Sequence, residues 1–112
     1  MPHSKPISLD AAAAALAHGT FNLLTRGREG SLSISADKWR CAGVEANAVR
    51  FEAVQPLGDS APPRSIALDE IQAITWDRLP KQEKRSQVRF HLTSGDLLTF
   101  SGQVDESALA QD

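Results

Sequence analysis

The sequence predicts a mainly β protein, in which antiparallel strands follow a short N-terminal helix and precede a truncated C-terminal helix. Its 112 residues match the length of one domain, and its hydrophobic share (41%) and charged share (23%) are those of a soluble globular protein. From residue 31 onward, apolar and polar residues alternate with a period of two, which is typical of half-buried strands. Turn-forming residues separate these stretches without helical crossovers, which favours antiparallel meanders.

The N-terminal part of the chain predicts one short helix after a loose start. Residues 1–7 contain two prolines and are expected to be loosely held. Ser8 is positioned to cap a helix, Asp10 suits the positive end of the helix dipole, and Gly19 supplies a left-handed stop. We therefore expect a helix within residues 8–19. Its apolar surface consists mostly of alanine methyl groups, so we expect it to pack weakly.

The segments that follow predict strands. Residues 31–35, SLSIS, place Leu32 and Ile34 on one face and serines on the other, and residues 47–54, NAVRFEAV, alternate in the same way. Residues 55–64 are rich in proline, glycine and serine, and they predict a loop. The strand pattern resumes in RSIALDEIQAITW, where the acidic pair predicts a bend.

The last third of the chain predicts a hairpin and the start of a helix. Residues 78–86 form a charged turn, and QVRFHLTSGDLLTFSG then alternates on both sides of a turn at Gly95. Asp105 suits a helix N-cap, and the helix ends with the chain after about two turns. This order suits a small barrel or sandwich, with residues 28–110 as barrel and helix start. A flat two-layer α+β sheet is the alternative.

Few residues carry chemistry that would indicate an enzyme or a cofactor. His3, His18 and His91 are widely spaced and Cys41 is alone, so we expect no metal site, no intramolecular disulfide and a reducing compartment. Cys41 with His91 as its base is available in almost any chain with one of each, and a half-buried structural thiol is the better interpretation. RGREG, residues 26–30, lacks the flanking strand and helix of a phosphate loop and predicts a turn.

The two tryptophans have two possible roles. Trp39 and Trp76 both stand among charged residues at strand ends, and Asp77 and Arg78 directly follow Trp76. A tryptophan at a strand end usually covers the core with its N–H directed outward. The other role is an anchor at a protein interface, where tryptophan and arginine are enriched.

One segment concentrates basic residues. Arg78, Lys81, Lys84 and Arg85 are candidates to contact phosphate, of either a nucleic acid or an anionic lipid. Acidic neighbours dilute this charge, so a solvated turn is the other interpretation. Formal net charge is −2, tyrosine is absent and aromatic residues are few, so we expect weak or no direct nucleic-acid binding.

Three segments together carry a resemblance: GSLSISADKWRC, IALDEIQAITWDR and VRFHLTSGDLLTFSGQVDESAL. They hold, in order, a G-x-L-x-I strand, an L-x-E-I segment before a strand that ends in tryptophan, and a hairpin that ends in F-x-G at Phe100–Gly102. This order resembles the pleckstrin-homology-like fold. More narrowly, it is similar to the N-terminal domain of the small subunit of the FACT histone chaperone, the structure-specific recognition protein family. The likeness covers residues 28–110, but Gln103 stands where that family has an aromatic residue.

The resemblance implies a non-catalytic domain that forms a heterodimer with the large chaperone subunit, in a complex that handles histones and nucleosomes in the nucleus. Trp76, Asp77 and Arg78, with Trp39 and Phe100, are then the candidate partner-binding residues. No cofactor and no membrane is implied. If the resemblance fails, we expect a cytoplasmic protein. The alternative function is a pleckstrin-homology-like module that binds anionic lipid or phosphate through the basic residues named above.

Overall fold

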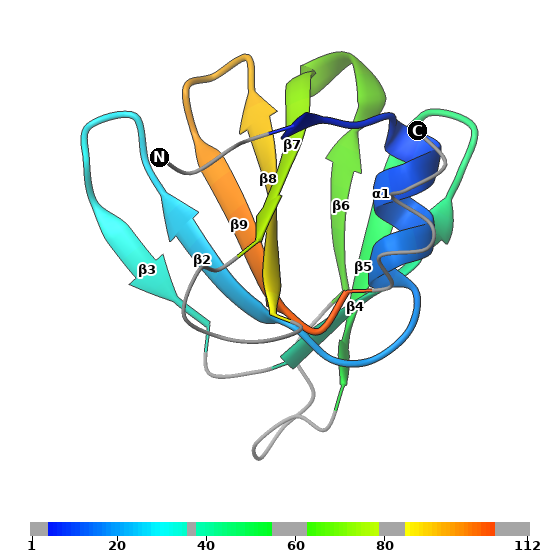
Figure 1. Cartoon of the computed structure of the whole chain (residues 1–112). Helices are drawn as coiled ribbons and strands as arrows, with labels where there is room; N and C mark the ends of the chain where they lie inside the picture. Colours follow the sequence, from blue (N-terminus) through cyan, green and yellow to red (C-terminus); the bar gives the residue numbers. More distant parts are fainter. Residues whose placement is uncertain (1–4, 36–37, 55–62, 79–84, 105–112) are drawn as a thin grey trace.

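Two antiparallel sheets and one α-helix make up the described part of the chain (Figure 1). The structure is a computed structural model, and it describes residues 5–35, 38–54, 63–78 and 85–104. Its elements are β1 (Lys5–Pro6), α1 (Leu9–Leu16), β2 (Asn22–Arg26), β3 (Leu32–Ile34), β4 (Lys38–Val44), β5 (Ala48–Val54), β6 (Arg64–Ala67), the 3-10 turn η1 (Leu68–Glu70), β7 (Ile71–Arg78), β8 (Ser86–Leu92) and β9 (Leu97–Gly102). Sheet A has the order β1-β7-β8-β9-β2-β3, and sheet B has the order β4-β5-β6. The predicted mainly β, antiparallel class is confirmed.

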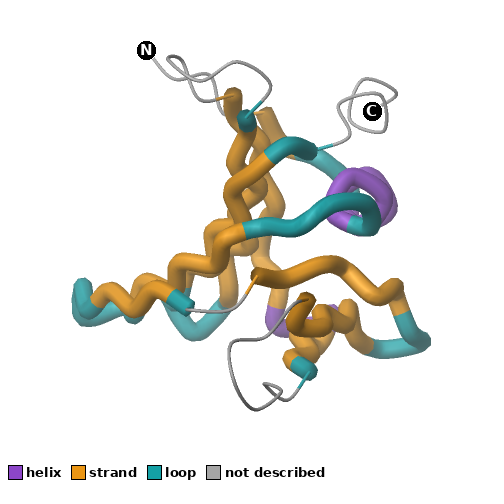
Figure 2. The backbone as a smooth tube through the Cα atoms, turned by 90° about the horizontal axis from the view of Figure 1, so that it is seen from below, coloured by secondary structure: helices purple, strands orange, loops and turns teal. Residues whose placement is uncertain are grey.

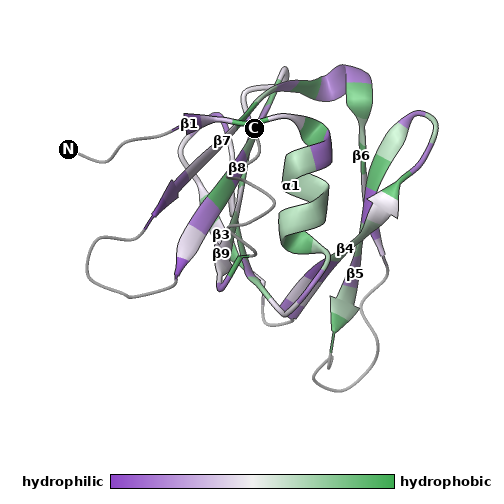
Figure 3. Ribbon diagram, turned by 45° about the vertical axis from the view of Figure 1, so that its right-hand side comes forward, coloured by the Kyte–Doolittle hydropathy of each residue, from purple (hydrophilic) through white to green (hydrophobic). Residues whose placement is uncertain are grey.

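Helix α1 lies between the two sheets (Figure 3). Ser8 Oγ accepts a hydrogen bond from the Ala11 N–H at 3.1 Å, which confirms the predicted cap. Ala12, Ala15 and Leu16 are fully buried in the core. The expectation of weak packing is wrong, because small side chains let the helix backbone approach the strands closely and fill the space between the sheets.

Replacing Ser8 with alanine should destabilise the protein by about 1 kcal/mol. The reason is that the backbone N–H of Ala11 would lose the hydroxyl acceptor that satisfies it at the start of the helix. Urea unfolding followed by circular dichroism measures the change. Ser8→Asp serves as the control, because a carboxylate can accept the same hydrogen bond, and it should keep the wild-type midpoint.

The chain before α1 is held by sheet A. The two residues of β1 pair with the end of β7. Ile7 is buried, and its N–H donates to the Ile74 carbonyl oxygen at 3.0 Å. The expectation of a loose start is therefore wrong for residues 5–7, while residues 1–4 lie outside the described part of the chain.

Besides the two-residue β1, the longer strands β2 and β4 were not predicted. In β2, Leu23 is buried and Leu24 is half-buried on the opposite face, so the pair of leucines hides the alternation. In β4, the ladder shifts between Cys41 and Gly43, and this bulge breaks the period of two. The statement that no strand precedes RGREG is wrong, because β2 ends at Arg26. Its interpretation as a turn is confirmed, since the turn joins β2 to β3.

The strands do not close into a barrel. Within the described residues, β6 and β7 are joined by η1 rather than paired, and the sheets share one isolated bridge, between Phe21 and Trp39. The predicted barrel is replaced by two open sheets, because α1 occupies the space between them. Figures 1 and 2 place α1 and the β2–β3 hairpin on opposite sides of the molecule. The predicted C-terminal helix from Asp105 falls outside the described residues.

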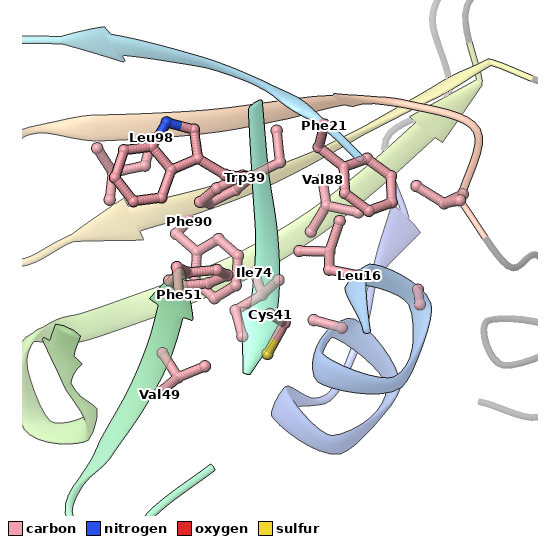
Figure 4. Packing of buried hydrophobic residues seen from close by; sticks show 14 of the residues in the cluster. Leu16, Phe21, Trp39, Cys41, Val49, Phe51, Ile74, Val88, Phe90 and Leu98 are labelled. Carbon is pink, nitrogen blue, oxygen red and sulfur yellow. The ribbon is translucent and has the colours of Figure 1, made fainter. Parts of the chain in front are cut away.

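Phenylalanine rings from both sheets meet in the core, and Figure 4 shows two of them, Phe51 and Phe90, next to one another. Phe51 of sheet B stacks on Phe100 of sheet A, with ring centroids 4.5 Å apart and an interplanar angle of 21°. Phe90 meets both rings edge-on, at centroid distances of 5.6 and 5.8 Å. These contacts hold the two sheets together opposite the side that α1 fills.

Candidate functional site

The predicted partner-binding segment lies at the end of β7. Trp76 is half-buried and packs against the core cluster, and its Nε1 is buried without a hydrogen-bond partner among the described residues. The exposed Arg78 ends the strand, opposite Ser86 of β8. The indole therefore covers the core while part of its ring reaches solvent.

Asp77 is directed to the outer face of sheet A, where it is 4% exposed. Its Oδ1 lies 3.3 Å from Nη1 of Arg89, and Nη2 of Arg89 donates to Gln87 Oε1 at 3.2 Å. Among the described residues, Asp77 Oδ1 has no contact with hydrogen-bond geometry, so charge attraction dominates its contact with Arg89. The Asp77 carboxylate is thus covered by neighbouring side chains on this face, and it offers little surface to a partner.

The other two predicted partner-binding residues lie in the core. Trp39 is 4% exposed, and its Nε1 donates to Ser35 Oγ at 2.9 Å. Phe100 is 1% exposed in the aromatic cluster. A partner cannot contact these rings in this conformation, so neither residue is part of a binding surface.

The predicted basic residues are only partly described. Lys81 and Lys84 lie outside the described part of the chain. Arg85 lines a polar pocket of about 360 Å³ together with Lys38, at the end of the molecule where β4 and β8 begin. Lys38 Nζ donates to Asn22 Oδ1, and Arg85 Nε is buried without a partner among the described residues. Arg85 thus shares a pocket with a second cationic side chain, Lys38, which was not among the residues selected from the sequence.

An exposed apolar edge lies at β3. Leu32 is 65% exposed and Ile34 is 76% exposed, although both are large and apolar. Both side chains share one face, as predicted, and Ile34 stands opposite Leu24 of β2. β3 ends the strand order of sheet A, so its outer side carries no further strand within the described ranges. Sequence reasoning found the alternation here but did not select these residues as a site.

The register of β3 directs the backbone groups of Leu32 and Ile34 to the free edge. Ser31 accepts a backbone hydrogen bond from the preceding turn at 2.8 Å, and Ser35 donates one to β2 at 3.0 Å. In an antiparallel ladder, residues bonded to the neighbouring strand alternate with residues whose N–H and C=O point away. The residues bonded toward β2 are therefore Ser31, Ser33 and Ser35. Leu32 and Ile34 offer both an unpaired donor and an unpaired acceptor to an approaching strand.

Two arginines lie near this edge. Arg26 stands opposite Leu32 in the hairpin, and both Arg26 and Arg28 are exposed. Glu29 is also exposed; the Ser31 hydroxyl donates to its carboxylate and lowers the pKa of that carboxyl, which favours the charged form. We name Leu32, Ile34 and the two arginines the β3 edge surface.

Cys41 is buried in sheet B, and burial raises the pKa of its thiol above the usual 9.0. His91 is bound to Thr75 instead, with His91 Nε2 and Thr75 Oγ1 3.0 Å apart on the outer face of sheet A. No group of three or more potential metal-ligating side chains gathers in the described segments. None of the helices in those segments has the length and apolar character needed to cross a membrane.

The thiol of Cys41 should react slowly in the folded protein. Because the thiolate is the reactive form, a raised pKa lowers the reactive fraction at any pH below it, and burial blocks the reagent. At pH 8 we expect a rate at least about tenfold below that of the urea-unfolded chain. An aromatic disulfide reagent measures both rates. Equal rates in the folded and unfolded chain would show that sheet B opens freely.

Comparison with known proteins adds no relative: no protein-family model, no curated protein and no solved structure matches this chain.

Proposed function

We propose that this protein is a non-catalytic binding domain that takes an extended segment of a protein partner along β3. The observation that carries the proposal is the combination of two strongly exposed apolar side chains with outward backbone groups on one edge strand. Exposed edges are usually protected by shortness, charge, proline or a covering element; β3 is short, but its three residues carry no charge or proline, and no further strand pairs with it among the described residues. Strand addition uses such an edge for affinity and its alternate side chains for specificity.

The chemistry of the β3 edge surface defines the partner. Leu32 and Ile34 favour a segment with apolar residues at alternate positions, which would extend the apolar row across the new strand. Arg26 and Arg28 favour acidic residues beside that segment. The resemblance to the FACT histone chaperone names the large chaperone subunit as the first natural partner to test.

The test uses two ligands and matched variants of the full chain. The first ligand is a short synthetic peptide in which valine and threonine alternate between flanking glutamates; the second is the large chaperone subunit. Ile34→Lys places a charge on the edge and should weaken peptide binding by about tenfold or more. Val44→Lys is the control, because Val44 is also exposed (40%) but belongs to sheet B. Both variants should keep the wild-type stability within about 0.5 kcal/mol.

Calorimetric titration separates the outcomes. Tight binding that Ile34→Lys removes and Val44→Lys keeps supports the proposal. A peptide with flanking lysines should bind less tightly than the acidic one, since two exposed arginines outnumber Glu29 beside the edge. Failure of the acidic peptide to bind, or equal affinity for both variants, would overturn strand addition at β3. Binding of the chaperone subunit decides only whether that protein is the natural partner.

A second candidate function is anion binding, which the pairing of Lys38 and Arg85 in one polar pocket favours. No carboxylate lines this pocket among the described residues, so the two positive charges would attract phosphate. Inorganic phosphate and vesicles containing phosphatidylserine are the probes. Salt-sensitive binding that Lys38→Gln weakens supports the site, whereas equal binding by wild type and variant removes it.

A further inference from the structure

A second concave site lies between the two sheets. Its pocket of about 140 Å³ is bounded by β6, the edge of sheet B, and by the inner face of sheet A from β2, β8 and β9. Helix α1 packs mainly against β4, the opposite edge of sheet B, so the helix leaves this side of the space between the sheets unfilled.

The buried part of the pocket is apolar. Five lining side chains are almost inaccessible to solvent and come from both sheets: Leu23, Phe51, Ile66, Leu98 and Phe100. The stacked pair of aromatic rings in this set is fixed by its mutual packing. The floor is therefore preformed and holds no charged group.

The size of the pocket matches one ring. An enclosed apolar cavity of about 150 Å³ holds a benzene molecule in an engineered protein interior. The pocket of about 140 Å³ here has a similar volume and an apolar floor, but it opens to solvent at a polar rim. One aromatic ring is therefore the size that its floor can hold.

The rim is polar and carries charges of both signs. Arg64 and Glu70 are exposed at the mouth, and neither side chain has an interaction partner within the described residues. Asp96 also lines the pocket, and its Oδ1 accepts the Arg28 N–H at 3.2 Å. Positive and negative side chains lie together on the rim, so their effects on a charged ligand partly cancel. The rim therefore gives no strong preference for a charged ligand.

We propose that this pocket binds a small neutral apolar molecule about the size of a single aromatic ring, with the ring against the apolar floor. The site is separate from the β3 edge surface, since its lining residues face inward from sheet A. A test of ligand binding in this pocket is therefore independent of the test of strand addition at β3.

Toluene is the probe, and methyl NMR of the full chain is the readout. We expect saturable shifts at the methyl groups of Leu23, Ile66 and Leu98, with a dissociation constant on the order of 1 mM. Thr25→Phe is designed to fill the pocket, because Thr25 is half-buried and lines it. Arg64→Phe is designed to cover the mouth, because Arg64 is exposed, lines the pocket and stands opposite Phe51 on the inner face of sheet B.

The variants decide the outcome together. Both substitutions should weaken toluene binding at least tenfold, and Thr20→Phe, an exposed position that does not line the pocket, should leave it unchanged. If Thr25→Phe fails to fold, Arg64→Phe still gives the answer. Absence of saturable shifts in the wild type, or unchanged affinity in the folded filling variants, would overturn the site.

Discussion

Replacing Phe51 with alanine should lower the free energy of unfolding by about 3–5 kcal/mol. Phe51 is the ring that connects the sheets, since it stacks on Phe100 and meets Phe90 edge-on. Its removal loses the buried area, leaves a cavity and breaks both aromatic contacts. Domains of this size are stable by only about 5–15 kcal/mol, so the variant should lose a large part of its stability.

Thermal and urea unfolding measure this change. The loss should lower the melting temperature by more than about 10 °C, given roughly 4–8 °C per kcal/mol for small domains. Phe51→Leu is the matched control, and it should cost about 1–2 kcal/mol because it keeps most of the apolar volume. A loss below about 1 kcal/mol for Phe51→Ala would contradict a core built on this ring.

Replacing Arg89 with methionine should destabilise the protein by about 3 kcal/mol. Asp77 is almost fully buried, and Arg89 supplies its nearby positive charge at 3.3 Å. The variant would leave a carboxylate in a poorly solvated place without a compensating cation. The cost falls at the lower end of the range for buried ion pairs, because the Arg89 side chain is itself 30% exposed.

A second substitution separates lost charge from lost packing. Adding Asp77→Asn to Arg89→Met removes the uncompensated charge and should recover part of the stability. Urea unfolding of the two single variants and the double variant gives the coupling between the two side chains. If Arg89→Met is neutral, or if the effects of the two substitutions simply add, the ion pair does not stabilise the fold.

Sequence patterns predicted those elements whose contacts are local. The β8–β9 hairpin was predicted because Val88 and Phe90 alternate with polar residues and Gly95 supplies the turn, with a φ of 96°. The cap at Ser8 was predicted for the same reason. The open sheets were not, since they depend on how closely α1 inserts, and the alanine side chains of α1 suggested only weak packing.

The candidate surfaces depend on long-range placement. The sequence put Leu32 and Ile34 on one face, but only the strand order shows that β3 is the edge of sheet A, with no further strand beside it in the described part of the chain. Lys38 and Arg85 meet through strands far apart in the chain. Trp39 was noted because of its charged neighbours, yet β4 turns its ring inward, and no local pattern distinguishes these two outcomes.

Amide hydrogen exchange at β3 tests the proposed strand addition most directly. In the free protein, the N–H groups of Leu32 and Ile34 point away from sheet A and should exchange quickly, while that of Ser33 points toward β2 and serves as the internal reference. With the acidic peptide bound, both edge amides should slow by at least about tenfold, because they donate to the added strand. Peptide binding that leaves the exchange of Leu32 and Ile34 unchanged would contradict strand addition at this edge.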